Sequence, residues 1–367
     1  MSTSNKQHVM VALDLGNKFV KIKSQKKSYC FPTAMLPKKQ TGRALVGGLG
    51  TASKAELFST AINDHDNMYF GPGLTEMGYE ASWVSTIGFG LSRYTSSDFK
   101  AMFEYALAIA AKDFEEEMLE IDLVTGLPSM DEQNDEIVEY LADFLRRSHT
   151  VKVVNEKQNT EQEITYTVKA LIIVPQYYGT LWDLAVDDDL NILDTRIIEG
   201  TVGVVDFGGG TTLVDTAHQL GLGAGSNSWQ DDTGVDYFHR AVHLTSPLAD
   251  YKIERIYLEG DEEKGYIYNP GNLLQIKNLT EPFMEQRQNA TDYMKSVYRR
   301  RFPKPEELSV IFQTGGGANF LLENQMVELF DGKVSVEFIK DSQMANVRGY
   351  YKLGIREGLG EYGDEEE

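Results

Sequence analysis

One short pattern occurs twice in this chain, and it constrains the fold more than any other feature of the sequence. A run of apolar residues ends in Asp-x-Gly at Asp14 and again at Asp206, 192 positions later. Each copy continues through a glycine turn into a second strand, which is the pattern of a β-hairpin. A repeat at this spacing predicts two related α/β halves, and we expect both aspartates and both turns to lie at one cleft.

Strands and helices alternate through the rest of the chain. Apolar patterning predicts strands at 121–125, 151–154, 164–174, 309–313 and 334–339, and helices at 99–114, 234–244, 281–300, 318–329 and 345–357. Ser129 begins an apparent capping box, so we expect it to open a helix that carries Ile137 and Leu141. We expect Cys30, the single cysteine, to lie in the core.

The charge of the chain limits its partners. The 35 basic and 56 acidic residues give a net charge of −21, so phosphate backbones and anionic membranes are repelled. No stretch approaches the ~20 apolar residues of a membrane span, and the polar N-terminus lacks the apolar core of a secretory signal. We therefore expect a cytoplasmic protein of two domains, at roughly 150 residues per domain.

The sharpest chemical signal is Asp206-Phe207-Gly208-Gly209-Gly210-Thr211-Thr212. Three successive glycines let backbone N–H groups approach phosphate oxygens, and the threonine hydroxyls add hydrogen bonds. A carboxylate at the end of a buried strand is costly unless it has a partner, and hydrated Mg²⁺ would be such a partner. The alternative is a hairpin turn without function, which the second copy at Asp14 disfavours.

Two further segments support a phosphate-binding role. In the first copy, the turn at Gly16, Asn17 and Lys18 offers backbone donors, and Lys21 could neutralise phosphate charge or be a solvated lysine. Gly315, Gly316 and Gly317, followed by Asn319, leave room for a flat ring or a ribose against backbone. Neither glycine cluster fits a P-loop or the dinucleotide fingerprint of Rossmann folds.

Taken in order, these motifs resemble the phosphate-1, phosphate-2 and adenosine motifs of the actin, heat-shock chaperone and sugar-kinase superfamily. Within it, the chain is similar to bacterial actin-like ATPases of the plasmid-segregating ParM type, and most similar to those of Gram-positive plasmids. The phrases that carry the resemblance are at 12–17, 125–129, 205–208, 314–319 and 346–350.

The resemblance implies an α/β fold of two domains with duplicated mixed β-sheet cores and a central nucleotide cleft. Domain I would comprise 1–175 and 340–367 with a small subdomain inserted at about 37–90. Domain II would comprise 176–339 with a second insertion at about 217–285.

The resemblance also implies roles for individual residues. Asp14 and Asp206 would hold Mg²⁺ through water, and Lys21 would touch the β-phosphate. Gln176 would orient the attacking water, a step that needs positioning more than a strong base. The nucleotide, ATP or alternatively GTP, would be bound by Gly16, Asn17, Lys18, Gly208, Gly209, Gly210, Thr211, Thr212, Gly315, Gly316, Gly317 and Asn319.

The function implied is that of an ATPase that forms homopolymeric filaments and moves plasmid DNA. The acidic charge argues against direct nucleic-acid or membrane binding, so a ParR-like DNA-binding adaptor with centromere-like DNA would be needed. The alternatives are a small-molecule kinase of the same superfamily and a cytoskeletal actin homologue with a role outside plasmids. A DnaK-type chaperone would need a peptide-binding domain, which we do not expect here.

Overall fold

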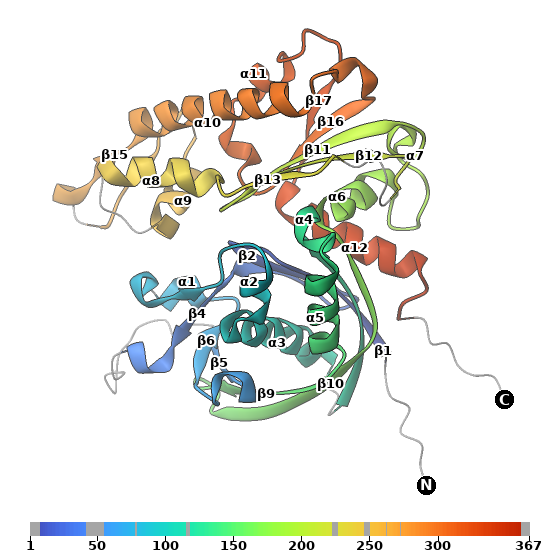
Figure 1. The fold of residues 1–367 in the computed structure, drawn as a ribbon. Helices are drawn as coiled ribbons and strands as arrows, with labels where there is room; N and C mark the ends of the chain where they lie inside the picture. Colours follow the sequence, from blue (N-terminus) through green and yellow to red (C-terminus); the bar gives the residue numbers. More distant parts are fainter. Residues whose placement is uncertain are drawn as a thin grey trace. The chain divides into compact units, whose positions relative to one another are not determined.

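The computed structural model describes residues 8–41, 55–77, 79–114, 118–221, 227–245, 250–261, 263–271 and 273–360. The chain divides into two compact units (Figure 1): unit 1 comprises residues up to 195 and from 344 onward, and unit 2 comprises residues 196–343. Our domain boundaries, with their two insertions, remain predictions.

Unit 1 is built on a mixed sheet of ten strands in the order β3-β2-β1-β8-β10-β9-β5-β6-β4-β7. The strands are β1 (His8–Leu15), β2 (Phe19–Ser24), β3 (Ser28–Pro32), β4 (Ala34–Pro37), β5 (Glu56–Ser59), β6 (Met68–Phe70), β7 (Val84–Ser85), β8 (Met118–Leu127), β9 (Ser148–Asn155) and β10 (Thr160–Pro175). Its helices are α1 (Leu74–Met77), α2 (Leu91–Thr95), α3 (Ser97–Ala111), α4 (Ser129–Glu132), α5 (Asp135–Leu145), α6 (Gln176–Ala185) and α12 (Ala345–Arg356).

The alternation of side chains along β1 explains why helices cover both faces of this sheet. Val9, Val11 and Leu13 belong to the large core cluster that includes α3 and α5. Met10 lies on the other face, where it contacts Gly354 of α12. Because successive residues of a strand point to opposite faces, a strand that is apolar throughout must be covered on both sides.

Unit 2 contains a five-stranded sheet in the order β13-β12-β11-β16-β17. Its strands are β11 (Thr201–Phe207), β12 (Thr212–His218), β13 (Trp229–Asp231), β16 (Val310–Thr314) and β17 (Val336–Phe338), and β14 (Ile267–Tyr268) pairs separately with β15 (Lys277–Asn278). The helices are α8 (Val235–Thr245), α9 (Asp250–Glu259), α10 (Thr280–Arg301) and α11 (Glu323–Val327), while α7 (Thr195–Glu199) lies at the boundary between the units.

The predicted repeat is confirmed at the level of strand pairing. In unit 1, β1 pairs antiparallel with β2 and parallel with β8. In unit 2, β11 pairs antiparallel with β12 and parallel with β16. Asp14 is opposite Lys21 in the first hairpin, and Asp206 is opposite Leu213 in the second. The two aspartates therefore hold equivalent positions, but only the first has a lysine across from it.

Several local predictions were wrong. Ser129 opens only the single turn of α4, and α5 starts separately, with the Asn134 side chain accepting the N–H of Glu136 at 3.1 Å. The predicted helix at 318–329 consists of a 3₁₀ turn, η7 (Ala318–Phe320), followed by the short α11. Cys30 is exposed, because it lies on the outward face of the edge strand β3 while Phe31 points into the core. None of the helices in the described part of the chain is long and apolar enough to cross a membrane.

Candidate functional site

In unit 1, three residues that are predicted to act together converge on one carboxylate. Asp14 lies at the end of β1 and is only 1% exposed. The ammonium nitrogen of Lys21 is 3.0 Å from its Oδ2, and Nε2 of Gln176 donates to its Oδ1 at 3.2 Å. A buried carboxylate requires such partners, because its desolvation is otherwise uncompensated. In the sequence, Lys21 is 7 positions from Asp14 and Gln176 is 162 positions from it.

The hairpin turn between β1 and β2 is held by its own backbone and by one side chain. The N–H of Gly16 donates to the carbonyl of Phe19, and the Thr33 hydroxyl donates to the carbonyl of Gly16 at 2.8 Å. A Cβ on Gly16 would lie 3.0 Å from that Phe19 oxygen and 3.3 Å from the Lys21 nitrogen. Glycine at this position therefore keeps the turn tight beside the Asp14–Lys21 pair.

Two contacts tie this turn to the segment before α2. Oδ1 of Asn17 accepts the N–H of Gly88 at 3.0 Å, so the Asn17 side chain is directed at backbone within unit 1. Arg93 is buried and donates to the carbonyls of Leu15 at 2.8 Å and Thr86 at 3.0 Å. Sequence reasoning missed Arg93, because nothing near it in the sequence marks an arginine that binds backbone carbonyls far along the chain.

Helix α6 positions Gln176 and is in turn held by α12. β10 ends at Pro175 and α6 begins with Gln176. A Cβ on Gly349 would lie 1.7 Å from the carbonyl oxygen of Gly179, so the two helices touch through their glycines. The Thr180 hydroxyl donates to Asn346 at 2.6 Å, and Lys352 donates to the Asp183 carboxylate at 3.0 Å. This close packing of α6 against α12 fixes the position of α6, and therefore the position of Gln176 at its first residue.

In unit 2, the glycine turn after Asp206 is closed by backbone contacts with the start of α8. Gly208 donates to the carbonyl of Thr211 at 2.8 Å, and the N–H groups of Val235 and Asp236 donate to the carbonyls of Gly208 and Gly209. The buried Thr212 hydroxyl donates to the carbonyl of Thr233 at 2.6 Å. The Thr212 side chain thus stabilises the turn by binding backbone inside the protein.

The third glycine cluster lies directly against Asp206. Thr314 is the parallel neighbour of Asp206, and Gly315 follows with φ = +92°. A Cβ on Gly315 would lie 2.3 Å from Oδ1 of Asp206, whereas a Cβ on Gly316 would meet nothing within 4 Å. Gly315 therefore permits close approach to the carboxylate, and Gly316 faces open space.

Side chains that the sequence did not point to hold this cluster in place. The Ser342 hydroxyl donates to the carbonyl of Gly315 at 2.9 Å, and the Tyr257 hydroxyl donates to the carbonyl of Asn319. Arg287 donates to the carbonyls of Phe320 at 3.2 Å and Leu321 at 3.4 Å. All three bind backbone carbonyls across long sequence separations, which no local motif reveals.

The residues of each half fit the group that the resemblance implies. Hard cations such as Mg²⁺ prefer oxygen ligands and often keep several waters, so they need few carboxylates. Unit 1 offers Asp14 and unit 2 offers Asp206. No group of three or more His, Cys, Asp or Glu that could hold a metal ion occurs among the described residues.

The comparisons with known proteins agree with this fold. Residues 12–179 match the family described as actin like proteins, N-terminal domain. None of the curated proteins matches the chain in sequence.

Solved structures match over nearly the whole chain. The pSK41 ParM protein in its apo form is 24% identical with a TM-score of 0.70, covering 96% of this chain and 99% of its own. The Bacillus thuringiensis ParM with AMPPNP is 15% identical with a TM-score of 0.65, covering 96% and 100%. The Alp12 filament structure is 15% identical with a TM-score of 0.64, also covering 96% and 100%.

The chain therefore has the actin-like fold of the α/β class, with two mixed β-sheet domains, which confirms the predicted fold class. Among the structures that share this fold, one was solved with a nucleotide analogue and one was solved as a filament.

Proposed function

We propose that this chain is a bacterial actin-like ATPase that binds Mg²⁺-ATP, hydrolyses it and assembles into filaments. The observation that carries the proposal is the convergence of Lys21 and Gln176 on the buried carboxylate of Asp14. Two structures with the same fold, the ParM with AMPPNP and the Alp12 filament, support nucleotide binding and assembly.

The proposed chemistry assigns one task to each side chain. Nε2 of Gln176 donates to Asp14, which leaves Oε1 of the same amide to accept a hydrogen bond from the attacking water. The Lys21 ammonium would stabilise negative charge on the phosphate chain, and Asp14 and Asp206 would hold the hydrated metal, which neutralises phosphate charge when bound. The glycine turns at 208–210 and 315–317 would bind phosphate and nucleoside through backbone.

In the cell, we propose that the filament moves plasmid DNA through a ParR-like adaptor. The support is the likeness to ParM proteins together with the net charge of −21, which disfavours direct contact with DNA phosphates.

Phosphate release and pelleting by ultracentrifugation, measured on the same samples, test the enzymatic proposal. The wild type should release phosphate and pellet with Mg²⁺-ATP. Asp206→Ala should lose hydrolysis and bind nucleotide much more weakly, because its carboxylate is lost, while Asp232→Ala, an exposed aspartate nearby, should behave as wild type. Wild-type turnover in Asp206→Ala would contradict the site assignment.

A further inference from the structure

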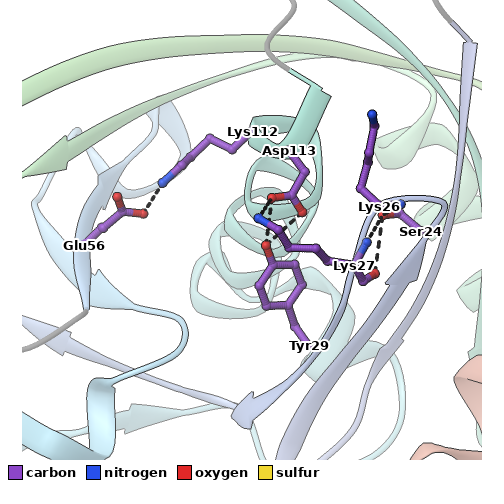
Figure 2. A network of polar contacts seen from close by, with 7 residues as sticks. All are labelled: Ser24, Lys26, Lys27, Tyr29, Glu56, Lys112 and Asp113. Atoms are coloured by element: carbon purple, nitrogen blue, oxygen red, sulfur yellow. Dashed lines mark hydrogen bonds and ion pairs between the residues drawn. The ribbon is translucent and has the colours of Figure 1, made fainter.

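A cavity in unit 1 lies outside both half-sites, at the end of α3, and five of its lining residues belong to the polar network in Figure 2. Its volume is about 250 Å³, and it is lined by Lys27, Tyr29, Glu56, Phe58, Phe70, Pro72, Ile109, Lys112 and Asp113. We call it the lysine-rimmed cavity. It combines the turn between β2 and β3, strands β3, β5 and β6, the C-terminal part of α3 and η4 (Lys112–Phe114).

The two carboxylates at this cavity already have partners and are largely covered. Asp113 accepts hydrogen bonds from the Lys27 ammonium at 2.6 Å and from the Tyr29 hydroxyl at 2.8 Å. The Asp113 side chain is 6% exposed. Glu56 accepts hydrogen bonds from Lys112 and Asn155, and its side chain is 19% exposed. The two lysines are more exposed than the carboxylates, with the Lys27 side chain 60% and the Lys112 side chain 30% exposed.

A visiting group would therefore meet donors rather than acceptors. Each ammonium has three N–H donors, and one carboxylate uses only part of that capacity. The Ser24 hydroxyl accepts the N–H groups of Lys26 and Lys27 at 3.2 and 3.3 Å, which fixes the turn that presents Lys27 (Figure 2). The sequence continues after Phe114 into three glutamates at 115–117, which lie outside the described residues.

The pKa shifts of Lys27 and Tyr29 agree with their assignment as hydrogen-bond donors. The hydrogen bond to Asp113 raises the pKa of Lys27, so it stays charged. Burial and the neighbouring Asp113 raise the pKa of Tyr29 to about 12, so its hydroxyl stays protonated and donates.

The floor of the cavity is apolar and rigid. Phe70 packs edge-on against Phe31 at 5.2 Å and Phe58 at 5.9 Å between ring centroids. Ile109 and Pro72 complete the apolar lining. A complementary group must thus be acidic at its edge and apolar at its centre.

A loop elsewhere in unit 1 has that composition. Between α6 and α7, Asp188 and Asp189 are exposed and form no ion pair within the described residues, and they are followed closely by Ile192 and Leu193, which are 60% and 63% exposed. We call residues 187–193 the acidic loop. The loop therefore combines two exposed carboxylates with two exposed aliphatic side chains.

The acidic loop is preorganised. Oδ1 of Asp187 accepts the N–H groups of Asp189 at 2.9 Å and Asn191 at 2.8 Å, and Val186 forms a β-bridge with Ile192. Leu190 has φ = +63°, a left-handed conformation that a side chain adopts only when its surroundings enforce it. A loop already fixed in shape loses less entropy on binding.

We propose that the acidic loop of one copy docks into the lysine-rimmed cavity of a second copy. In this contact, Asp188 and Asp189 face the ammonium groups of Lys27 and Lys112, and Ile192 covers the apolar floor. The two surfaces are different, so the contact is heterologous and can repeat without closing, which is the geometry of a filament. The inference rests on the proposed function and specifies one contact of the polymer.

Charge reversal on each surface gives a test with internal rescue. Lys27→Glu and the double variant Asp188→Lys/Asp189→Lys should each raise the critical concentration for ATP-dependent assembly at least about tenfold, because like charges then face each other. In an equimolar mixture, the two variants can alternate along the filament. The wild-type loop of Lys27→Glu then meets the wild-type cavity of the double variant. The lysine-bearing loop of the double variant meets the glutamate-bearing cavity of Lys27→Glu. The mixture should therefore assemble at a concentration where neither variant does.

Three measurements make the result decisive. Ile192→Ser should also raise the critical concentration, and Lys304→Glu, at an exposed lysine in unit 2, should not. All variants should bind a fluorescent ATP analogue as wild type does, which shows that they are folded. Unchanged assembly of both charge variants, or no rescue in the mixture, would overturn the contact while leaving the proposed function intact. A wild type that never assembles would overturn both.

Discussion

The carboxylate of Asp14 shows how much of the first half-site depends on single side chains. Its oxygens accept one hydrogen bond from Lys21 and one from Gln176, and the residue is buried. Removal of one partner of a buried charge usually costs more than the pair contributes, because the other charge is left uncompensated. Lys21 and Gln176 are not equivalent partners of Asp14, because Lys21 brings a positive charge and Gln176 brings a neutral amide.

Substitution of Gln176 should separate hydrolysis from assembly. Gln176→Ala removes the amide that we propose positions the attacking water, but it removes no charge, so the variant should still bind ATP and assemble. Phosphate release should fall by ~10²-fold, which would leave polymers that persist. Stopped-flow phosphate detection beside light scattering measures both, with Gln162→Ala, an exposed position of β10, as the control. Equal release by Gln176→Ala and wild type would refute the role.

The sequence predicted some of these residues and could not predict others. Asp14, Asp206 and their glycines are visible because strand, aspartate and turn are local patterns. Gln176 reached the candidate site only through the resemblance, since its contact with Asp14 spans 162 positions. Arg93, Tyr257, Arg287 and Ser342 were missed because each binds a backbone carbonyl, and no sequence pattern encodes such a partner.

At the scale of elements, the hairpins and long helices were predictable and the short elements were not. α3 and α10 carry apolar residues at helical spacing, and both lie where expected. α9 was missed because the surrounding residues 245–280 show little periodicity, although Ile253 and Ile256 are buried. The segment after Gly317 breaks into a 3₁₀ turn and α11, because tertiary contacts from Arg287 to Phe320 and Leu321 override local helix propensity.

The contact between α6 and α12 depends on Gly349. In Gly349→Ala, the added methyl group would overlap the carbonyl of Gly179, so the helices must separate. We expect a loss of about 1–3 kcal/mol in the free energy of unfolding, measured by urea denaturation. Hydrolysis should fall as well, since α6 carries Gln176. Gly316→Ala, whose Cβ meets nothing within 4 Å and whose φ is not positive, is the matched control for the unfolding measurement. Full stability in Gly349→Ala would contradict the helix contact.

The neighbouring glycines 315 and 316 form a matched pair. Gly315→Ala places a methyl group against Asp206 at a position with φ = +92°, so it should destabilise the protein by about 1–3 kcal/mol. Gly316→Ala meets open space and should leave the unfolding free energy unchanged, but it should weaken nucleotide binding if that space holds the nucleoside. Isothermal titration with an ATP analogue measures the affinity. Unaltered affinity in Gly316→Ala would exclude the turn from the binding surface.

For the whole molecule, net charge makes a prediction about DNA. Lys and Arg contacts to phosphate supply most non-specific affinity, and this chain has 35 basic against 56 acidic residues. The purified protein should not shift duplex DNA at physiological salt, and should be recruited only with a DNA-binding adaptor and its repeats. A gel-shift assay with and without the adaptor tests this. Micromolar binding by the protein alone, with a steep salt dependence, would contradict it.

Electron microscopy of the purified protein with and without Mg²⁺-ATP tests directly whether assembly depends on the nucleotide. We expect filaments with Mg²⁺-ATP, none without nucleotide, and none for Asp206→Ala under the same conditions. Filaments that form equally without nucleotide would contradict the coupling of assembly to the site. Complete absence of filaments at any protein concentration, from a chain that binds and hydrolyses ATP, would contradict the central claim and favour another ATPase of the same fold.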